Sequence, residues 1–273
     1  MTTSDRVHRR VQRYGWDLAV ADYERAWVPS VAAFSAGCVE RARLGAGERV
    51  LDVATGPGTA ALLAAERVGA SGQVLGIDIS GKMTELAAER AAAAGLAQCR
   101  FARHDMEETG QADGAFDAVL CVLGLMFAAD SAAALRELRR VTAPGGRIAV
   151  CVWGRRSHCA WADLFPIVDR QVASDVCPLF FSLGAPGALA AALQQAGFRD
   201  AAEERSSLTL DWQSPEQACA AAFLGGAVAL AYSKFGPEVR EIVQREFLES
   251  IAVHRHDQGY RVPAEFVYGV AHL

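Results

Sequence analysis

The segment Val50-Leu51-Asp52-Val53-Ala54-Thr55-Gly56-Pro57-Gly58-Thr59 carries the strongest structural signal in the chain. Its apolar first half predicts a buried strand, and the Ala-rich residues that follow it predict a helix. Between them, Gly56 allows a backbone angle that other residues avoid, and Gly58 lets a ligand approach the backbone closely. Asp52 lies near the end of the strand, where its carboxylate can receive or orient a cationic group.

The alternation of strand and helix that begins here continues to residue 153. We expect strands at 49–54, 73–78, 100–102, 116–122 and 147–153, and helices at 59–68, 81–94 and 131–141. Pro144-Gly145-Gly146 predicts a turn that ends the last of these helices before the final strand begins. Strands that alternate with helices in this way predict a parallel sheet covered on both faces and built from right-handed crossovers.

Two flanking regions complete the expected organisation. We expect a helical cap at residues 1–44, the core at residues 45–153, and the remainder of the sheet at residues 154–273. In this last region we expect a helix at 186–196, strands at 206–212 and 265–272, and a largely helical insertion at 215–253. The predicted fold class is therefore α/β, with a Rossmann-like, doubly wound, mainly parallel sheet, a helical cap and a late helical insertion.

A second acidic residue follows the next predicted strand. Asp78 stands at the tip of that strand, where a carboxylate is well placed for two ribose hydroxyls. In open parallel sheets, ligands bind in the crevice beyond the carboxyl ends of the strands. Taken alone, Asp52 and Asp78 could be turn or helix caps. Residues 56–61 also fit the loose dinucleotide pattern G-x-G-x-x-A. This motif alone therefore does not distinguish a nicotinamide cofactor from other ligands.

The complete set of motifs separates these alternatives. In chain order it consists of Asp52, Gly56, Gly58, Asp78, His104-Asp105-Met106, Phe116-Asp117-Ala118-Val119-Leu120 and Pro144-Gly145-Gly146. Together these motifs resemble those of the class I S-adenosylmethionine-dependent methyltransferases, in the group around the ubiquinone/menaquinone C-methyltransferases. The resemblance is close over residues 45–153, and it extends loosely to Trp16, Tyr23 and residues 263–266.

The resemblance implies S-adenosylmethionine as the cofactor and methyl transfer to a small organic acceptor as the reaction. The cofactor-binding residues that it implies are Tyr23, Asp52, Ala54, Thr55, Gly56, Gly58, Asp78, Ile79, Met83, Asp105, Met106 and Cys121. Among them, Gly56 and Gly58 would make room for the methionine portion, Asp78 would bind the ribose, and Asp105 would accept from the adenine amino group. Ala54 replaces a glycine of many members, and we expect its small methyl group to be tolerated.

The acceptor is expected on the side of the late insertion. The apolar walls predicted for it are Met126, Phe127, Trp153 and Trp161. An amine acceptor needs only its lone pair, whereas a hydroxyl or a carbon acid needs a base, and His158 is the best candidate for that base. The later asparagine and tyrosine pattern of the quinone enzymes is missing, which argues against a quinone biosynthetic role.

Composition excludes several other classes of function. The formal net charge is −5, and we interpret the Arg-rich run 6–13 as a solvated helix face rather than a nucleic-acid contact. The seven cysteines form no CxxC pair and are expected to be buried and reduced, and neither they nor the histidines suggest a metal site.

The polar amino terminus predicts no signal peptide, and the apolar run 218–231 is shorter than the roughly 18 residues that a membrane span needs. We therefore expect a cytoplasmic protein, either monomer or homodimer.

Two rival functions remain at this stage. A nicotinamide-dependent oxidoreductase is favoured by the glycine pattern, but the chain has no recognisable Tyr-x-x-x-Lys catalytic motif. A repurposed S-adenosylmethionine-binding protein, such as a cyclase or a regulator, would have the same donor site as a methyltransferase. The acceptor and the methylated atom stay open.

Overall fold

The computed structural model describes residues 3–172 and 180–273. Within these ranges one eight-stranded sheet has the order β3-β2-β1-β4-β5-β8-β6, and the short β7 pairs with β8. The strands are β1 Arg49–Val53, β2 Gln73–Asp78, β3 Cys99–Arg103, β4 Phe116–Val122, β5 Thr142–Trp153, β6 Arg199–Trp212, β7 Arg255–His256 and β8 Gly259–His272. The α-helices are α1 Thr3–Ala26, α2 Val28–Ala42, α3 Thr59–Val68, α4 Gly81–Ala93, α5 Ser131–Val141, α6 Leu164–Asp169, α7 Ala188–Gln195, α8 Pro215–Cys219, α9 Ala229–Tyr232 and α10 Pro237–Ser250.

Strands β1 to β5 are parallel, and β8 lies antiparallel between β5 and β6. Val53, the last residue of β1, is in register with Ile77 of β2 and Cys121 of β4. The carboxyl ends of these three strands therefore meet at one edge of the sheet. Such an edge is where ligands bind in open parallel sheets.

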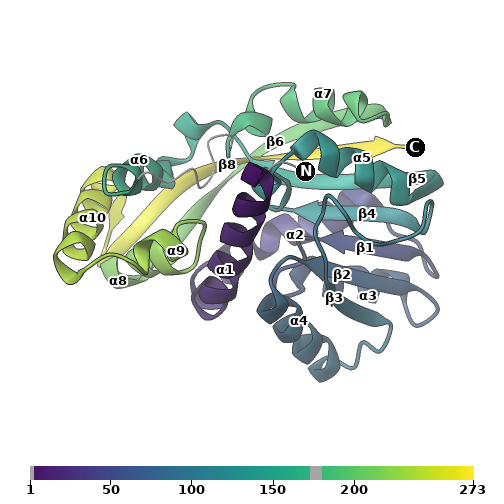
Figure 1. The fold of residues 1–273 in the computed structure, drawn as a ribbon, viewed down its shortest axis with the longest axis horizontal. Helices are drawn as coiled ribbons and strands as arrows, with labels where there is room; N and C mark the ends of the chain where they lie inside the picture. The colour runs from purple at the N-terminus through teal and green to yellow at the C-terminus, as the bar shows by residue number, and fades with distance from the viewer. Residues whose placement is uncertain (1–2, 173–179) are drawn as a thin grey trace.

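Figure 1 shows what covers this edge. Helix α1 runs across the carboxyl ends of the parallel strands, and β6 and β8 continue past it to carry α8, α9 and α10. Helix α1 therefore lies between this edge and the helices of the late insertion. The division of the chain into a cap, a core and a remainder at 44/45 and 153/154 stays a prediction.

The fold class expected from the sequence is confirmed, with one local correction. The segment 144–146, expected as a turn before the fifth strand, lies inside β5. Phe116 pairs with Thr142 and Ala118 already pairs with Arg147, so residues 143–146 form a bulge in the strand. The strands expected at 206–212 and 265–272 are longer, because β6 and β8 pair with each other from Arg199–His272 to Trp212–Tyr260.

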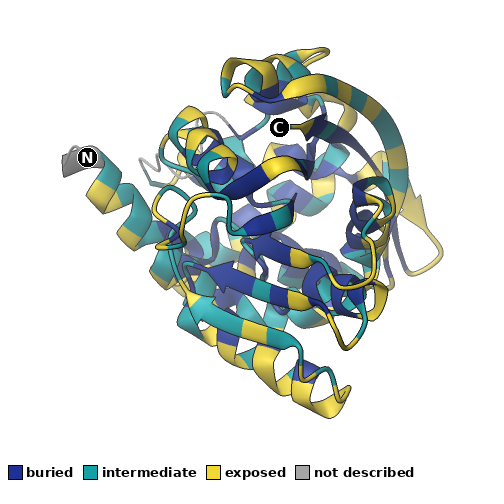
Figure 2. Cartoon of the chain, turned by 90° about the vertical axis from the view of Figure 1, so that its right-hand side faces the viewer, coloured by how far each residue is buried: buried dark blue, intermediate teal, exposed yellow. Residues whose placement is uncertain are grey.

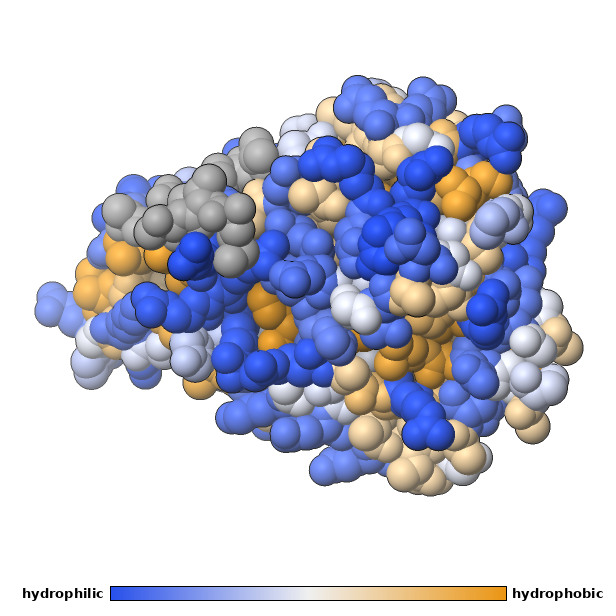
Figure 3. All heavy atoms as spheres, turned by 45° about the vertical axis from the view of Figure 1, so that its right-hand side comes forward, coloured by the Kyte–Doolittle hydropathy of each residue, from blue (hydrophilic) through white to orange (hydrophobic). Residues whose placement is uncertain are grey.

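Burial follows the layers of the fold. In Figure 2 the strands at the centre are buried, whereas the helices present alternating buried and exposed residues. On the face shown in Figure 3, hydrophilic side chains cover most of the surface and hydrophobic ones form separate small patches. Across the described residues, none of the helices has both the length and the apolar character that crossing a bilayer requires.

Candidate functional site

Three adjoining cavities lie at the carboxyl edge of the sheet, and we name each by its lining. The carboxylate cavity is lined by Asp78, Ile79, Met83, Asp105, Met106 and Glu107, among others, and has a volume of about 720 Å³, including space open to solvent. The loop cavity is lined by Asp52, Thr55, Gly56, Pro57, Thr59 and Ala60, among others, with about 360 Å³. The aromatic cavity is lined by Trp27, Trp153, Trp161, Phe165 and Phe180, among others, with about 480 Å³.

Tyr23 and Leu123 line all three cavities. Tyr23 comes from α1, and Leu123 directly follows β4. The backbone of Leu123 has φ +53°, a left-handed conformation that is unusual for a residue with a branched side chain. Backbone strain of this kind tends to gather at functional sites. The backbone is therefore strained at the junction of the three cavities.

Asp78 is the best-defined polar group of the carboxylate cavity. Its Oδ2 accepts from the backbone N–H of Gly56 at 2.9 Å, and its Oδ1 accepts from that of Ser80 at 2.9 Å. The residue is 8% exposed, and burial raises the pKa of its carboxyl to about 6. The two backbone donors fix the carboxylate at the tip of β2, where its remaining lone pairs can accept from ligand hydroxyls.

Asp52 gives the loop cavity its electrostatic character. Thr55 Oγ1 donates to Asp52 Oδ2 at 2.6 Å, and Asp52 is 1% exposed. Burial raises the pKa of this carboxyl to about 7. A carboxyl at the start of α3 suits an ammonium group, whereas it would repel the pyrophosphate that dinucleotides place at a helix N-terminus. The local chemistry thus disfavours the nicotinamide alternative.

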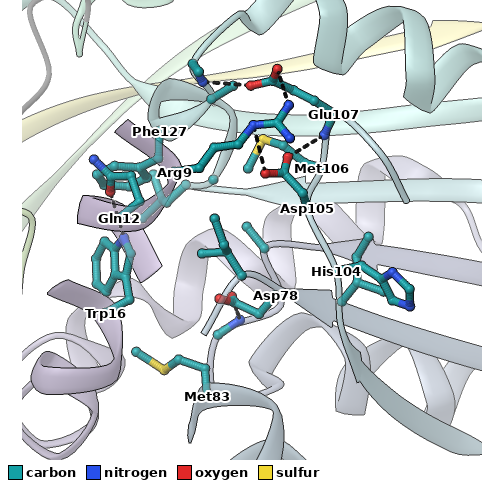
Figure 4. A pocket seen from close by; sticks show the side chains of 18 of the residues that line it. Arg9, Gln12, Trp16, Asp78, Met83, His104, Asp105, Met106, Glu107 and Phe127 are labelled. Carbon is teal, nitrogen blue, oxygen red and sulfur yellow. Dashed lines mark hydrogen bonds and ion pairs between the residues drawn. The ribbon is translucent and has the colours of Figure 1, made fainter. Parts of the chain in front are cut away.

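The far end of the carboxylate cavity is closed by an ion-pair cluster (Figure 4). Arg9 of α1 places its Nε 3.2 Å from Asp105 Oδ2 and its Nη2 2.8 Å from Glu107 Oε2. The backbone N–H of Glu107 donates to Asp105 Oδ1 at 2.8 Å. The Arg9 side chain is 20% exposed, so the interpretation of the whole run 6–13 as a solvated face is wrong at this position.

Helix α1 is tied to the core at further points along the cavity. Ser80 Oγ donates to Asp17 Oδ1 at 2.7 Å, and the ring of His8 lies with its Nε2 3.0 Å from the carbonyl oxygen of Phe127. Trp16 packs edge-on against both Tyr23 and Phe127, at centroid distances of 5.5 and 5.1 Å. The helix therefore forms one wall of the site.

Most of the residues implied by the resemblance do come together here. Tyr23, Ala54, Gly56, Asp78, Ile79, Met83, Asp105 and Met106 line the carboxylate cavity, and Asp52 and Thr55 line the loop cavity. Phe127, Trp153 and Trp161 line the aromatic cavity. His104, from the expected His104-Asp105-Met106 motif, also lines the site. Residues that the sequence did not indicate line it as well, namely His8, Arg9, Gln12, Glu107, Leu123 and Gly124.

Three of the expected residues line none of the three cavities. Gly58 has φ +83°, and a Cβ there would lie 3.0 Å from Ala87 Cβ of α4, so helix packing alone already favours glycine here. Its role beside the methionine portion of the donor stays a prediction. Cys121 is fully buried, and burial raises the pKa of its thiol to about 12. Met126 is 7% exposed and lines none of the three cavities described above.

His158 also lies outside the three cavities. Its Nδ1 is 2.8 Å from Glu265 Oε2, and the guanidinium of Arg155 contacts the same ring nitrogen at 2.9 Å. The His158 side chain is 44% exposed. Its role as a general base stays a prediction, and this placement lends it no support.

The described cysteines, histidines and acidic residues can be searched for a metal site. Within the described ranges, no group of three or more His, Cys, Asp or Glu residues is arranged to hold a metal ion. Six cysteines are described as free thiols, and Cys177 lies outside the described residues.

Comparison with known proteins agrees with this geometry. Residues 50–146 match a family model described as a methyltransferase domain. The chain is 35% identical over 138 residues to the ubiquinone/menaquinone biosynthesis C-methyltransferase UbiE of Geotalea daltonii, a match that covers 50% of this chain and 59% of that protein. It is 32% identical over 145 residues to the aklanonic acid methyltransferase DauC of Streptomyces sp. strain C5, covering 53% and 66%.

The fold recurs in solved structures. The YcgJ protein from Bacillus subtilis superposes with a TM-score of 0.61 at 18% identity, over 88% of this chain and 98% of that one. The sequence matches span 59% and 66% of the two curated relatives. The family model covers residues 50–146, which include the parallel strands β1 to β4 and the start of β5. The resemblance expected from the ordered motifs is confirmed over the matched part of the chain: residues 50–146 form a methyltransferase domain, and the sequence is similar to the ubiquinone/menaquinone C-methyltransferases.

Proposed function

We propose that this chain transfers the methyl group of S-adenosylmethionine to a small organic acceptor, with the donor in the carboxylate and loop cavities and the acceptor in the aromatic cavity. One observation carries the proposal. Tyr23 and Leu123 line all three cavities, so a donor that fills two of them presents its reactive centre to the third.

The lining residues fit the parts of the donor. The buried, backbone-held carboxylate of Asp78 suits the ribose hydroxyls, and the apolar side chains of Ile79 and Met83 suit the faces of the adenine. Asp105, at the far end, suits the adenine amino group. In the loop cavity, the Asp52 carboxyl suits the ammonium group of the methionine portion.

S-adenosylmethionine supplies a methyl group on a positively charged sulfur, which is electrophilic without help from a metal. What remains for the protein is to orient the acceptor and to exclude water, and these two effects supply much of the acceleration in such displacements. Helix α1 contributes to both through Tyr23 and Trp16, which stand between the carboxylate and aromatic cavities. The methylated atom, whether oxygen, nitrogen or carbon, stays open.

A small acceptor is supported by the activities for which the two relatives are named. One is a ubiquinone/menaquinone biosynthesis C-methyltransferase and the other an aklanonic acid methyltransferase, so both act on small organic molecules. The aromatic cavity supports the same class for this chain, because its lining is apolar and the described residues in it include no Lys or Arg to contact the phosphates of a nucleic acid. We further propose a cytoplasmic location, in keeping with the unpaired cysteines of the described residues, and a chain that acts as a monomer or a homodimer.

The test is a search for the methylated product. The wild-type protein and Asp78→Ala are incubated with S-adenosylmethionine carrying an isotope-labelled methyl group, together with small-molecule extracts of cells. We expect labelled products heavier than their precursors by one methylene, formed by the wild type and strongly reduced with Asp78→Ala. If the wild type binds S-adenosylmethionine but yields no labelled product across broad extracts, the chain is a repurposed binder and the proposal is wrong.

A further inference from the structure

The aromatic cavity has an unusual composition for a site that must hold a substrate. Eight of its sixteen lining residues are aromatic, and the others are Val, Leu, Ala and Gly. Among the described residues that line it, none is Asp, Glu, Lys, Arg or His. A buried ion without a counter-charge carries a large desolvation penalty, so this cavity strongly disfavours a charged ligand.

The walls of the cavity are held in place by ring-to-ring packing. Trp161 lies edge-on to Trp153 at a centroid distance of 5.0 Å and to Trp27 at 5.6 Å. Phe180 lies edge-on to Trp161 at 6.0 Å and to Phe127 at 5.3 Å. The late insertion contributes only small residues to this cavity, at 221, 222 and 225–227. Aromatic rings pack favourably against other rings, stacked or edge-on, so a lining that is half aromatic suits a flat ring system.

One polar group in these walls has no partner within the described part of the chain. Trp161 is 4% exposed, and its indole Nε1 is buried without a hydrogen bond. The neighbouring Trp27 shows the usual arrangement, because its Nε1 donates to the carbonyl oxygen of Ala221 at 2.8 Å. Buried donors are nearly always paired, and one left unpaired beside a cavity points to a ligand atom as its partner.

We propose that the aromatic cavity binds an uncharged, flat, largely apolar acceptor, and that Trp161 Nε1 donates a hydrogen bond to an oxygen of that molecule. This inference rests on the proposed function for its position, because Tyr23 and Leu123 join the aromatic cavity to the two cavities assigned to the donor. It adds the chemical class of the acceptor and a residue that selects for it. A carbonyl, ether or hydroxyl oxygen on a ring system meets both requirements.

The test compares three probes of similar size. 1-Tetralone is neutral and has a carbonyl oxygen, tetralin has the same rings without the oxygen, and 1-naphthoate carries a negative charge. Dissociation constants are measured by ligand-observed NMR titration of protein saturated with S-adenosylhomocysteine. We expect 1-tetralone to bind about three- to tenfold more tightly than tetralin, as one net hydrogen bond allows, and 1-naphthoate to bind more weakly than either.

Two variants locate the hydrogen bond. Trp161→Phe keeps an aromatic ring but removes the N–H, and it should abolish the difference between 1-tetralone and tetralin. Trp212→Phe is the matched control, because Trp212 Nε1 is also buried without a partner in the described chain, yet Trp212 lies outside the aromatic cavity. In that variant the difference should persist. If Trp161→Phe fails to fold, the ranking of the three probes on the wild type still tests the proposed class of acceptor.

Binding of S-adenosylhomocysteine is measured first in each protein. This separates a failure of the proposed function from a failure of the inference about the acceptor. A wild type that binds no S-adenosylhomocysteine contradicts the proposed function, whatever the probes do. If S-adenosylhomocysteine binds but 1-tetralone shows no advantage over tetralin, or 1-naphthoate binds as tightly as 1-tetralone, the inference about the acceptor is overturned. The same holds if the advantage of 1-tetralone survives in Trp161→Phe.

Discussion

The loop that joins β1 to α3 offers a quantitative test of the site geometry, because two small residues there depend on each other. Ala54 has φ +53°, in the left-handed region that favours glycine. Its methyl group points at Gly124, where an added Cβ would lie 2.4 Å from Ala54 Cβ and 3.1 Å from Cys121 Sγ. Both Ala54 and Gly124 line the carboxylate cavity.

The magnitudes follow from these contacts. Gly124→Ala forces a methyl into occupied space and should lower the free energy of unfolding by about 1–3 kcal/mol. Ala54→Gly relieves about 1–2 kcal/mol of left-handed strain but adds about 0.5–1 kcal/mol of backbone entropy to lose on folding, so the net gain in stability is about 0–1.5 kcal/mol. In the double variant the 2.4 Å contact is gone and the 3.1 Å contact with Cys121 remains, so recovery is large but incomplete.

Urea unfolding of the wild type, the two single variants and the double variant measures this coupling as a double-mutant cycle. We expect the double variant to be more stable than the sum of the single effects predicts, by at least about 1 kcal/mol. Titration with S-adenosylhomocysteine should show the weakest binding for Gly124→Ala, because the displaced loop lines the carboxylate cavity. Additivity within about 0.5 kcal/mol would refute the reasoning, since it would mean that the two residues do not contact each other.

Three further outcomes follow from the charged groups of the site. Burial raises the pKa of Asp78 to about 6, so S-adenosylhomocysteine should bind roughly tenfold more weakly at pH 5 than at pH 7 as this acceptor protonates, and calorimetry that found the same affinity at both would contradict its role. The folded-state pKa of Asp52, about 7, lies above its unfolded value, so ionisation of this carboxyl destabilises the fold. The unfolding free energy of the unliganded protein should therefore rise by on the order of 2 kcal/mol from pH 8 to pH 5. Asp52→Asn, measured at the same pH values, is the control and should lack this rise. Arg9→Met removes the ion pairs with the carboxylate cavity and should speed amide hydrogen exchange in α1, whereas the same change at the exposed Arg10 should not; equal exchange in both variants would show that Arg9 does not hold the helix.

The parallel core could be predicted closely because its signals are local. The helix at 59–68 and the strands at 73–78 and 116–122 have the expected bounds, since each is an apolar periodic run that ends at a clear turn signal. The bulge at 143–146 could not be predicted, because the Pro-Gly-Gly sequence signals a turn equally well whether the strand begins before it or after it.

The site was predictable only where a motif marks it. Asp52, Gly56 and Asp78 stand at strand ends, and sequence order alone brings them to one edge of the sheet. Arg9 lies in an amphipathic helix with several other arginines, and nothing in the pattern distinguishes the one that meets two partly buried carboxylates. Leu123 reads as one more apolar residue after a strand, although its positive φ and its position at the junction of three cavities set it apart.

Calorimetric titration of the wild type and of Asp78→Ala with S-adenosylhomocysteine and with NADH addresses the assignment of the carboxylate and loop cavities. Our structure predicts one saturable site per chain for S-adenosylhomocysteine, with affinity at least tenfold weaker in Asp78→Ala, and no saturable binding of NADH. Saturable binding of NADH with no response to S-adenosylhomocysteine would contradict the assignment, and an unchanged affinity in Asp78→Ala would show that the ribose lies elsewhere.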